Sequence, residues 1–145
     1  MAKKRIAVLF GGASADHAAS LHTAYSVLSS LPKEIEPLAI GITRAGRWLF
    51  YPGSYENIKD GSWEQDSDCC SCVISPDMTN KGVIKIISDG ESTIHRIDAV
   101  FPVLHGKYGE DGRVQGLCKL AGLPVIGNDF AAAALCNDLS LIHIS

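Results

Sequence analysis

Apolar runs alternate with amphipathic segments along this chain. Two runs are apolar at nearly every position: Arg5–Phe10, apart from Arg5 itself, and Ala99–Leu104. Such runs are typical of strands covered on both faces of a parallel sheet. Between them, apolar residues recur at helical spacing from Leu21 to Leu31, and Pro32 ends the pattern. The alternation of strand and helix indicates an α/β fold.

The middle of the chain predicts antiparallel additions. A strand over Ile35–Thr43 leads through a turn into a second short strand, and the most hairpin-like passage lies at 83–97. Residues 52–68 are polar and rich in turn formers. His95 alternates with apolar neighbours, which favours the solvent face of a strand over a ligand role.

After the second long apolar run, the pattern predicts a helix over Arg113–Ala121 that ends at Gly122, and then a short strand at Pro124–Gly127. An Ala-rich helix begins near Asn128. The predicted fold is therefore α/β with three layers: a mostly parallel, Rossmann-like sheet with small antiparallel additions.

Composition narrows the class of protein. The chain has 145 residues, of which 46% are hydrophobic and 20% charged, which suits one globular domain. The formal net charge is -3 and the basic residues are scattered, so nucleic-acid binding is disfavoured. No apolar run approaches the ~20 residues that cross a bilayer, and no signal peptide is evident, so we expect no membrane partner and a cytoplasmic location.

The five cysteines are interpreted as free thiols, because their number is odd and no matching histidine stands at metal spacing. Cys69, Cys70 and Cys72 form a cluster in a predicted polar loop. A soft metal is one interpretation of this cluster and incidental thiols are the other; we favour the second and predict no metal site. Cys118 and Cys136 are predicted core residues.

The two parallel strands are each followed by a polar loop, Gly11–Ser20 and His105–Gly116. Open α/β sheets bind ligands at the carboxyl ends of their strands. Helix capping accounts equally well for Ser14 or Asp16. Neither G-x-G-x-x-G nor a P-loop is present, so the loops predict a site for a ligand smaller than a nucleotide.

These loops resemble the amino-terminal domain of the D-alanine:D-alanine ligase family, whose patterns are roughly G-G-x-S-x-E-x-x-V-S and H-G-x-x-G-E-D-G-x-x-Q-G. His105–Gly116 meets the second pattern in full. The resemblance runs from about Arg5 to Asp138 and implies a pre-ATP-grasp domain. Segments 41–48 and 74–77 look most like the branch that includes the vancomycin-resistance D-alanine:D-serine enzymes.

The resemblance implies an ATP-dependent ligase that makes a peptidoglycan precursor. ATP phosphorylates one D-alanine carboxylate, and the amine of a second D-amino acid attacks the acyl phosphate. By resemblance, the substrate-binding residues are Asp16, which holds the ammonium of the first D-alanine, Ser14 in the same loop, and His105, which lies beside that substrate and is the catalytic candidate. The expected loop-support residues are Gly11, Gly12, Glu110, Asp111 and Gly112.

This chain departs from the first pattern. Asp16 replaces the family's glutamate, which shortens the reach of the carboxylate by about 1.5 Å. Ala18 and Ala19 stand where an acidic residue and valine are usual. His17, in the first turn of the predicted helix, is expected to be solvated and receives no catalytic role.

The domain expectation is an amino-terminal substrate-binding domain over 1–138 and a tail over 139–145 that does not match the family and is possibly non-native. ATP and Mg²⁺ would bind residues beyond Asp138, so this fragment alone is expected to bind neither and to be inactive. The intact enzyme is expected to bind D-alanine and to form a homodimer.

Two other classes remain open. One is a stand-alone module that binds a small amino acid for regulation, without catalysis. The other is a flavodoxin-like or Rossmann-like domain of another enzyme class, which the missing dinucleotide fingerprint and the intact His105–Gly116 pattern disfavour.

Overall fold

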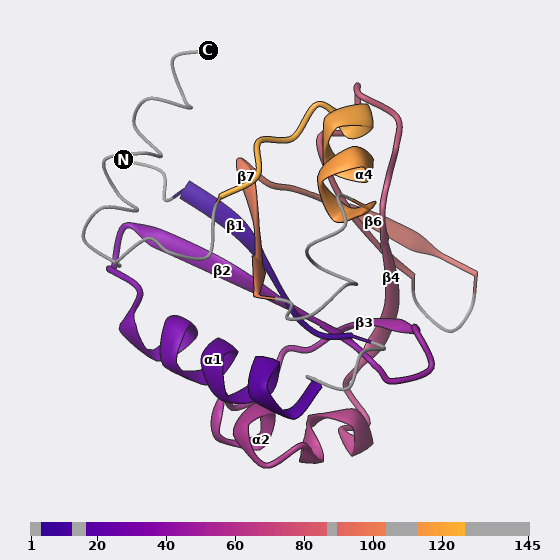
Figure 1. The fold of residues 1–145 in the computed structure, drawn as a ribbon. Helices are drawn as coiled ribbons and strands as arrows, with labels where there is room; N and C mark the ends of the chain where they lie inside the picture. Colours follow the sequence, from indigo (N-terminus) through magenta and orange to yellow (C-terminus); the bar gives the residue numbers. More distant parts are fainter. Residues whose placement is uncertain (1–3, 13–16, 87–89, 104–112, 127–145) are drawn as a thin grey trace.

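A computed structural model describes residues 4–12, 17–86, 90–103 and 113–126. Within these ranges, seven strands form one mixed sheet with helices on both faces (Figure 1). In chain order the elements are β1 Lys4–Gly11, α1 His17–Ser30, β2 Ile35–Ile42, β3 Trp48–Phe50, α2 Glu56–Lys59, the 3-10 helix η1 Ser62–Gln65, β4 Cys70–Ile74, β5 Gly82–Ile86, β6 Ser92–Arg96, β7 Ala99–Val103 and α4 Arg113–Ala121.

The parallel part of the sheet is built around β1. The strand order is β6-β5-β4-β3-β2-β1-β7, and β1 pairs in parallel with both of its neighbours. Both long apolar runs of the sequence are buried strands, as predicted. The predicted strand after α4 is a single parallel bridge between Val100 and Val125. The carboxyl ends of β1, β2 and β7 therefore meet at one edge of the sheet.

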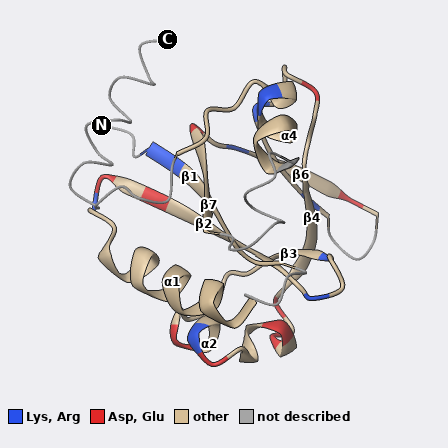
Figure 2. Cartoon of the chain, viewed as in Figure 1, with Lys and Arg blue, Asp and Glu red and all other residues tan. Residues whose placement is uncertain are grey.

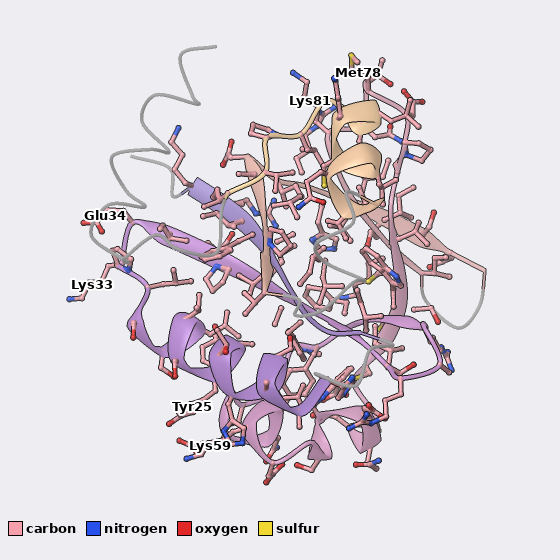
Figure 3. The ribbon with its side chains drawn as sticks, in the orientation of Figure 1. Tyr25, Lys33, Glu34, Lys59, Met78 and Lys81 are labelled. Atoms are coloured by element: carbon pink, nitrogen blue, oxygen red, sulfur yellow. The ribbon has the colours of Figure 1, made fainter. Side chains whose placement is uncertain are left out.

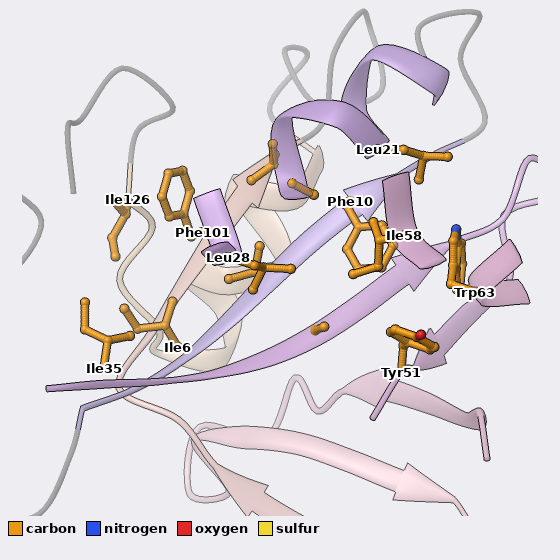
Figure 4. Packing of buried hydrophobic residues seen from close by; sticks show 14 of the residues in the cluster. Ile6, Phe10, Leu21, Leu28, Ile35, Tyr51, Ile58, Trp63, Phe101 and Ile126 are labelled. Atoms are coloured by element: carbon orange, nitrogen blue, oxygen red, sulfur yellow. The ribbon is translucent and has the colours of Figure 1, made fainter. Parts of the chain in front are cut away.

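Each face of the sheet carries its own core. Along β1 the side chains alternate, so Ile6, Val8 and Phe10 pack on one face while Ala7 and Leu9 pack on the other. Figure 4 shows the first core, to which α1, α2 and η1 contribute the buried side chains Leu21, Ala24, Leu28, Ile58 and Trp63. On the opposite face, α4 contributes Val114, Cys118 and Ala121. The three-layer prediction is confirmed.

The antiparallel part comprises β3 to β6 and includes both predicted hairpins. One strand in it was not expected: β4 begins at Cys70, inside the segment interpreted as a polar loop. That interpretation is wrong, because Cys72 and Ile74 are buried in the second core. The strand escaped notice because Cys-Ser-Cys gives little of the usual β-branched signal.

The turn-rich segment 52–68 also contains structure that the sequence did not predict. It folds into α2 and η1, which bring Ile58 and Trp63 to 0% exposure. The Trp63 ring centroid lies 5.1 Å from that of Phe10 and 6.3 Å from that of Tyr51. The indole also lies directly on the backbone of Gly41 in β2, where an added Cβ would overlap the ring. This segment therefore holds part of the core.

The prediction that His95 lies on the solvent face of its strand is wrong. His95 is half-buried and stacks on Phe50, with ring centroids 6.0 Å apart, whereas its apolar neighbour Ile94 is 51% exposed. Cross-strand pairing places Ile94 opposite Ile84, and Ile84 opposite Val73, which is 45% exposed. Beyond β3 the described helices do not cover this face of the sheet, since Val73 and Ile94 are exposed there, so alternation alone predicted the wrong side.

The pH dependence of stability should report this placement of His95. Burial, and then the positive charges of Lys85 and Arg5, hold the pKa of His95 below its usual 6.5. The folded state thus favours the neutral ring. As the pH falls through 6.5, the unfolded chain binds more protons at His95 than the folded chain does. The free energy of unfolding therefore decreases until the pH lies below the pKa of His95 in the folded state. The variant His95→Gln should lose less stability between about pH 7.5 and about pH 5.5 than the wild type, measured by urea unfolding at both values. An equal loss in the two proteins would contradict this account.

Charged residues lie on separate elements rather than in one stripe over the described residues (Figure 2). Figure 3 shows one local grouping, Tyr25 of α1 beside Lys59 of α2. The Lys59 ammonium lies 5.0 Å from the Tyr25 ring centroid, and the Tyr25 hydroxyl donates a 2.9 Å hydrogen bond to Glu56 Oε1, which raises the pKa of Tyr25. These contacts fasten α2 to α1. Among the described helices, none is long and apolar enough to cross a bilayer.

Candidate functional site

The candidate site begins at the edge where β1, β2 and β7 end. Gly12 N–H donates a 2.8 Å hydrogen bond to the carbonyl oxygen of Ile42, the last residue of β2. Phe10 lies opposite Val103, the last residue of β7. Residues 13–16 and 104–112, which carry the predicted side chains, follow directly in the sequence from these strand ends. The fold therefore starts both predicted loops from adjacent strands.

Gly11 is required by the backbone at this edge. Its φ is +88°, in the left-handed region that residues with a Cβ rarely adopt. A Cβ at this position would overlap the carbonyl oxygen of Ile42 and press on the imidazole of His17. The predicted glycine turn thus also serves the close approach of β2 and α1.

Ser20, in the first two turns of α1, links the two strand ends. Its side chain is 0% exposed. Gly11 N–H donates a 2.8 Å hydrogen bond to Ser20 Oγ, and the Ser20 hydroxyl donates to the carbonyl oxygen of Val103. We call these two hydrogen bonds the Ser20 bridge. One hydroxyl therefore contacts both strands from which the predicted loops emerge.

His17 is buried, and the prediction that it is solvated is wrong. It is 3% exposed, and its Nδ1 lies 2.7 Å from the carbonyl oxygen of Gly12. Because a carbonyl only accepts, Nδ1 must carry the hydrogen. Nε2 lies 3.8 Å from Glu64 Oε1 of η1, where an ion pair forms when the ring is protonated. His17 thus connects the start of the first loop to η1.

The cysteine cluster does not converge on one point. Cys69 packs against the first core, and its thiol donates to the carbonyl oxygen of Trp63, whereas Cys72 belongs to the core on the opposite face. Desolvation by burial, the main cause in each case, raises the pKa of Cys69 to about 11 and that of Cys72 to about 12. Cys118 is a core residue, as predicted. Among the described residues no group of three or more His, Cys, Asp or Glu could hold a metal ion.

Most of the residues predicted for the site lie outside the described part of the chain. Gly11 and Gly12 are at the end of β1, where the sequence put them. Outside the described residues lie Ser14, Asp16, His105, Glu110, Asp111 and Gly112, and also Cys136.

The sequence analysis gave no role to two residues of this edge. Ser20 received none although the last serine of the family pattern falls on it, and His17 received none because it was interpreted as solvated. A signal for both was present. The helical period that connects Leu21, Ala24 and Leu28 extends back to positions 20 and 17, so both side chains share the buried stripe of α1.

Known proteins are similar to this chain over nearly its whole length. Residues 5–128 match the family described as D-ala D-ala ligase N-terminus. A D-alanine–D-alanine ligase of Caldicellulosiruptor bescii is 46% identical over 139 residues, which cover 95% of this chain and 37% of that protein. The vancomycin/teicoplanin A-type resistance protein VanA of Enterococcus faecium is 39% identical over 145 residues, 99% of this chain and 40% of that protein.

Solved structures agree with these matches. The VanG D-Ala:D-Ser ligase of Enterococcus faecalis superimposes with a TM-score of 0.80 at 42% identity, over 86% of this chain and 35% of that one. The D-alanine-D-alanine ligase of Coxiella burnetii superimposes with a TM-score of 0.72 at 25% identity, over 97% and 40%. The chain thus spans well under half the length of these relatives. It belongs to the family of the amino-terminal domain of D-alanine:D-alanine ligases.

Proposed function

We propose that this chain is the substrate-binding part of an ATP-dependent D-alanine:D-alanine ligase that makes a peptidoglycan precursor. The observation that carries the proposal is the parallel pairing of β1 with β7 in a chain of this family, because it starts both motif-bearing loops at one edge of the sheet. In the proposed reaction ATP phosphorylates the carboxylate of one D-alanine, and the amine of a second D-alanine displaces the phosphate to form the peptide bond.

We propose that residues of the two loops bind and orient the first D-alanine. The Asp16 carboxylate would accept hydrogen bonds from its ammonium, with Ser14 contributing from the same loop, and His105 would lie beside the carboxylate that reacts. Holding a substrate in its reactive orientation is the main contribution of such contacts to a condensation of two molecules. Gly11 and Gly12 would support the first loop, and the second would be supported by Glu110, Asp111 and Gly112.

The remaining parts of the proposal concern the longer protein. This chain corresponds to only part of its relatives, and ATP and Mg²⁺ would bind residues outside that part. Mg²⁺ would neutralise phosphate charge there. The substrate-binding domain would comprise residues 1–138, and 139–145 would be a tail foreign to the family. The intact enzyme would be cytoplasmic and would form a homodimer. Light scattering of the full-length protein tests whether it is a dimer.

The test of the proposed function is ADP formation by the full-length protein with D-alanine, L-alanine or no amino acid. We expect ADP formation to depend on D-alanine. The variant Asp16→Asn removes the charge of one hydrogen-bond acceptor and should lower kcat/KM for D-alanine about 10- to 100-fold, since such a bond contributes roughly 1.5–3 kcal/mol. Asp68→Asn, at an exposed position, is the matched control and should behave as wild type.

Two outcomes would contradict the proposal in different ways. Binding of D-alanine without ADP formation would favour the stand-alone amino-acid-binding module. Full activity of Asp16→Asn would agree with the proposed ligase activity but would contradict the proposed role of Asp16 in binding D-alanine.

A further inference from the structure

Buried polar side chains are rare in the described part of this chain, and two of them lie together in α1. Those that are buried are His17, Ser20 and Ser75. Burying a hydroxyl is costly unless it is hydrogen-bonded, so a fully buried serine in a helix needs a structural reason. For Ser20 the reason is the Ser20 bridge, which satisfies the hydroxyl as donor and as acceptor.

The partners of this bridge are unusual for a helical serine. A serine within a helix ordinarily bonds to the carbonyl one turn earlier in its own helix. Ser20 instead bonds to Gly11, nine positions earlier, and to Val103, 83 positions later. Both partners lie at the last residue of a strand, and each strand continues into a loop of the candidate site. The hydroxyl therefore joins two segments that the chain itself brings together only through sheet pairing.

We propose that Ser20 is a positioning residue for the binding of the first D-alanine: its hydroxyl fixes the separation of the β1 and β7 ends, from which the two motif-bearing segments continue in the sequence. This inference rests on the proposed function and adds a determinant of substrate affinity to it. Ser20 need not contact the substrate, since a hydrogen bond to a charged ammonium weakens when its acceptor is displaced, and a weaker bond lowers the affinity for the substrate.

The Ser20 bridge lies where the pairing of β1 with β7 ends. Gly11 is the last residue of β1, and the register that pairs β1 with β7 ends one residue earlier, at Phe10 and Val103. The Gly11 N–H thus lies just past the ladder, and Ser20 Oγ is its acceptor. Loss of the hydroxyl would leave a buried donor at Gly11 and a buried acceptor at Val103 to find other partners.

The test uses three variants of the full-length protein. Ser20→Ala removes the hydroxyl. Ser20→Cys keeps a similar volume but replaces it with a thiol, a weak donor and a weak acceptor. Ser26→Ala is the matched control, because Ser26 lies in the same helix with an exposed side chain. The measurements are kcat, the KM for the first D-alanine, the KM for ATP, and hydrogen–deuterium exchange of peptides that end near Gly11 and Val103.

We expect Ser20→Ala and Ser20→Cys to raise the KM for the first D-alanine about tenfold or more, with kcat and the KM for ATP within about threefold of wild type. Exchange should rise at both strand ends, and Ser26→Ala should match wild type. A merely structural role predicts a different split, because partial unfolding lowers kcat through the active fraction and leaves KM unchanged.

Three results would overturn the inference: a fall in kcat with unchanged KM, wild-type behaviour of Ser20→Cys, or faster exchange at the strand ends with an unchanged KM for D-alanine. The proposed function fails separately, when the wild-type protein forms no ADP with D-alanine. In that case the exchange measurement still decides whether the Ser20 bridge exists, and the substrate-positioning role falls with the function.

Discussion

The variant Gly11→Ala should lower the free energy of unfolding by at least about 3 kcal/mol. Part of this cost is backbone strain, since φ at Gly11 is +88° and a residue with a Cβ pays roughly 1–2 kcal/mol in that region. The larger part is steric, because the new Cβ would overlap the Ile42 carbonyl oxygen, a backbone atom held in the sheet. Urea unfolding monitored by tryptophan fluorescence, to which the buried Trp63 contributes, measures the effect.

Gly46 provides a matched control for the strain. Its φ is +89°, and nothing lies within 4 Å of a Cβ added there. Gly46→Ala should therefore cost only about 1 kcal/mol. The difference between the two variants isolates the steric contribution at Gly11. Equal costs would show that β1 and β2 can separate at this edge without penalty, which contradicts the close approach in the structure.

The second large effect concerns the indole that lies on β2. Gly41→Ala should destabilise the protein by at least about 2 kcal/mol, because the added Cβ would overlap three atoms of the six-membered ring of Trp63. Trp63 is 0% exposed and contacts Phe10 and Tyr51, so a shift of the indole away from the new Cβ would disturb these ring contacts.

A double-mutant cycle tests this cause. Trp63→Phe removes the outer ring atoms that face Gly41, so Gly41→Ala should cost less than about 1 kcal/mol in that background. The free energies come from urea unfolding monitored by circular dichroism, since Trp63→Phe alters one of the two tryptophans that fluoresce. Additive costs in the double variant would mean that the clash with Trp63 is not the reason for glycine at position 41.

The indole also matters for the candidate site. Glu64 follows Trp63 in η1, and its carboxylate lies 3.8 Å from Nε2 of His17. The packing of Trp63 on Gly41 therefore holds η1 in place beside His17. Packing in the core is in this way linked through His17 to Gly12, at the end of β1.

What the sequence could predict depended on the range of the interactions that decide each feature. The apolar runs of β1 and β7 report burial on both faces by themselves, and the turns before β3 and between β5 and β6 report hairpins, so these elements were predicted correctly. Trp63 was missed because its burial depends on Gly41 and Phe10, which are distant in sequence. A polar segment with one aromatic residue carries no period that reveals such a partner.

The site shows the same division. The glycines at the end of β1 and the resemblance to the ligase family were readable from local sequence, and the family is confirmed. His17 was assigned to solvent because a histidine in a first helical turn usually is exposed. Its burial follows from the carbonyl of Gly12 and from η1, which no local rule supplies. The face of His95 was likewise decided by Phe50 across the sheet.

The central position of β1 has a consequence for how the molecule is made. Arg5 and Asp98, which are hydrogen-bonded at the start of this pairing, are 93 positions apart in the chain. Contacts of such long range form slowly compared with a helix or a hairpin. During synthesis β1 leaves the ribosome long before β7 exists, and until then it offers a bare apolar edge of the kind that promotes aggregation. The two strand ends of the site are thus joined only after β7 is made, and a nascent chain that pauses before β7 is exposed to misassembly.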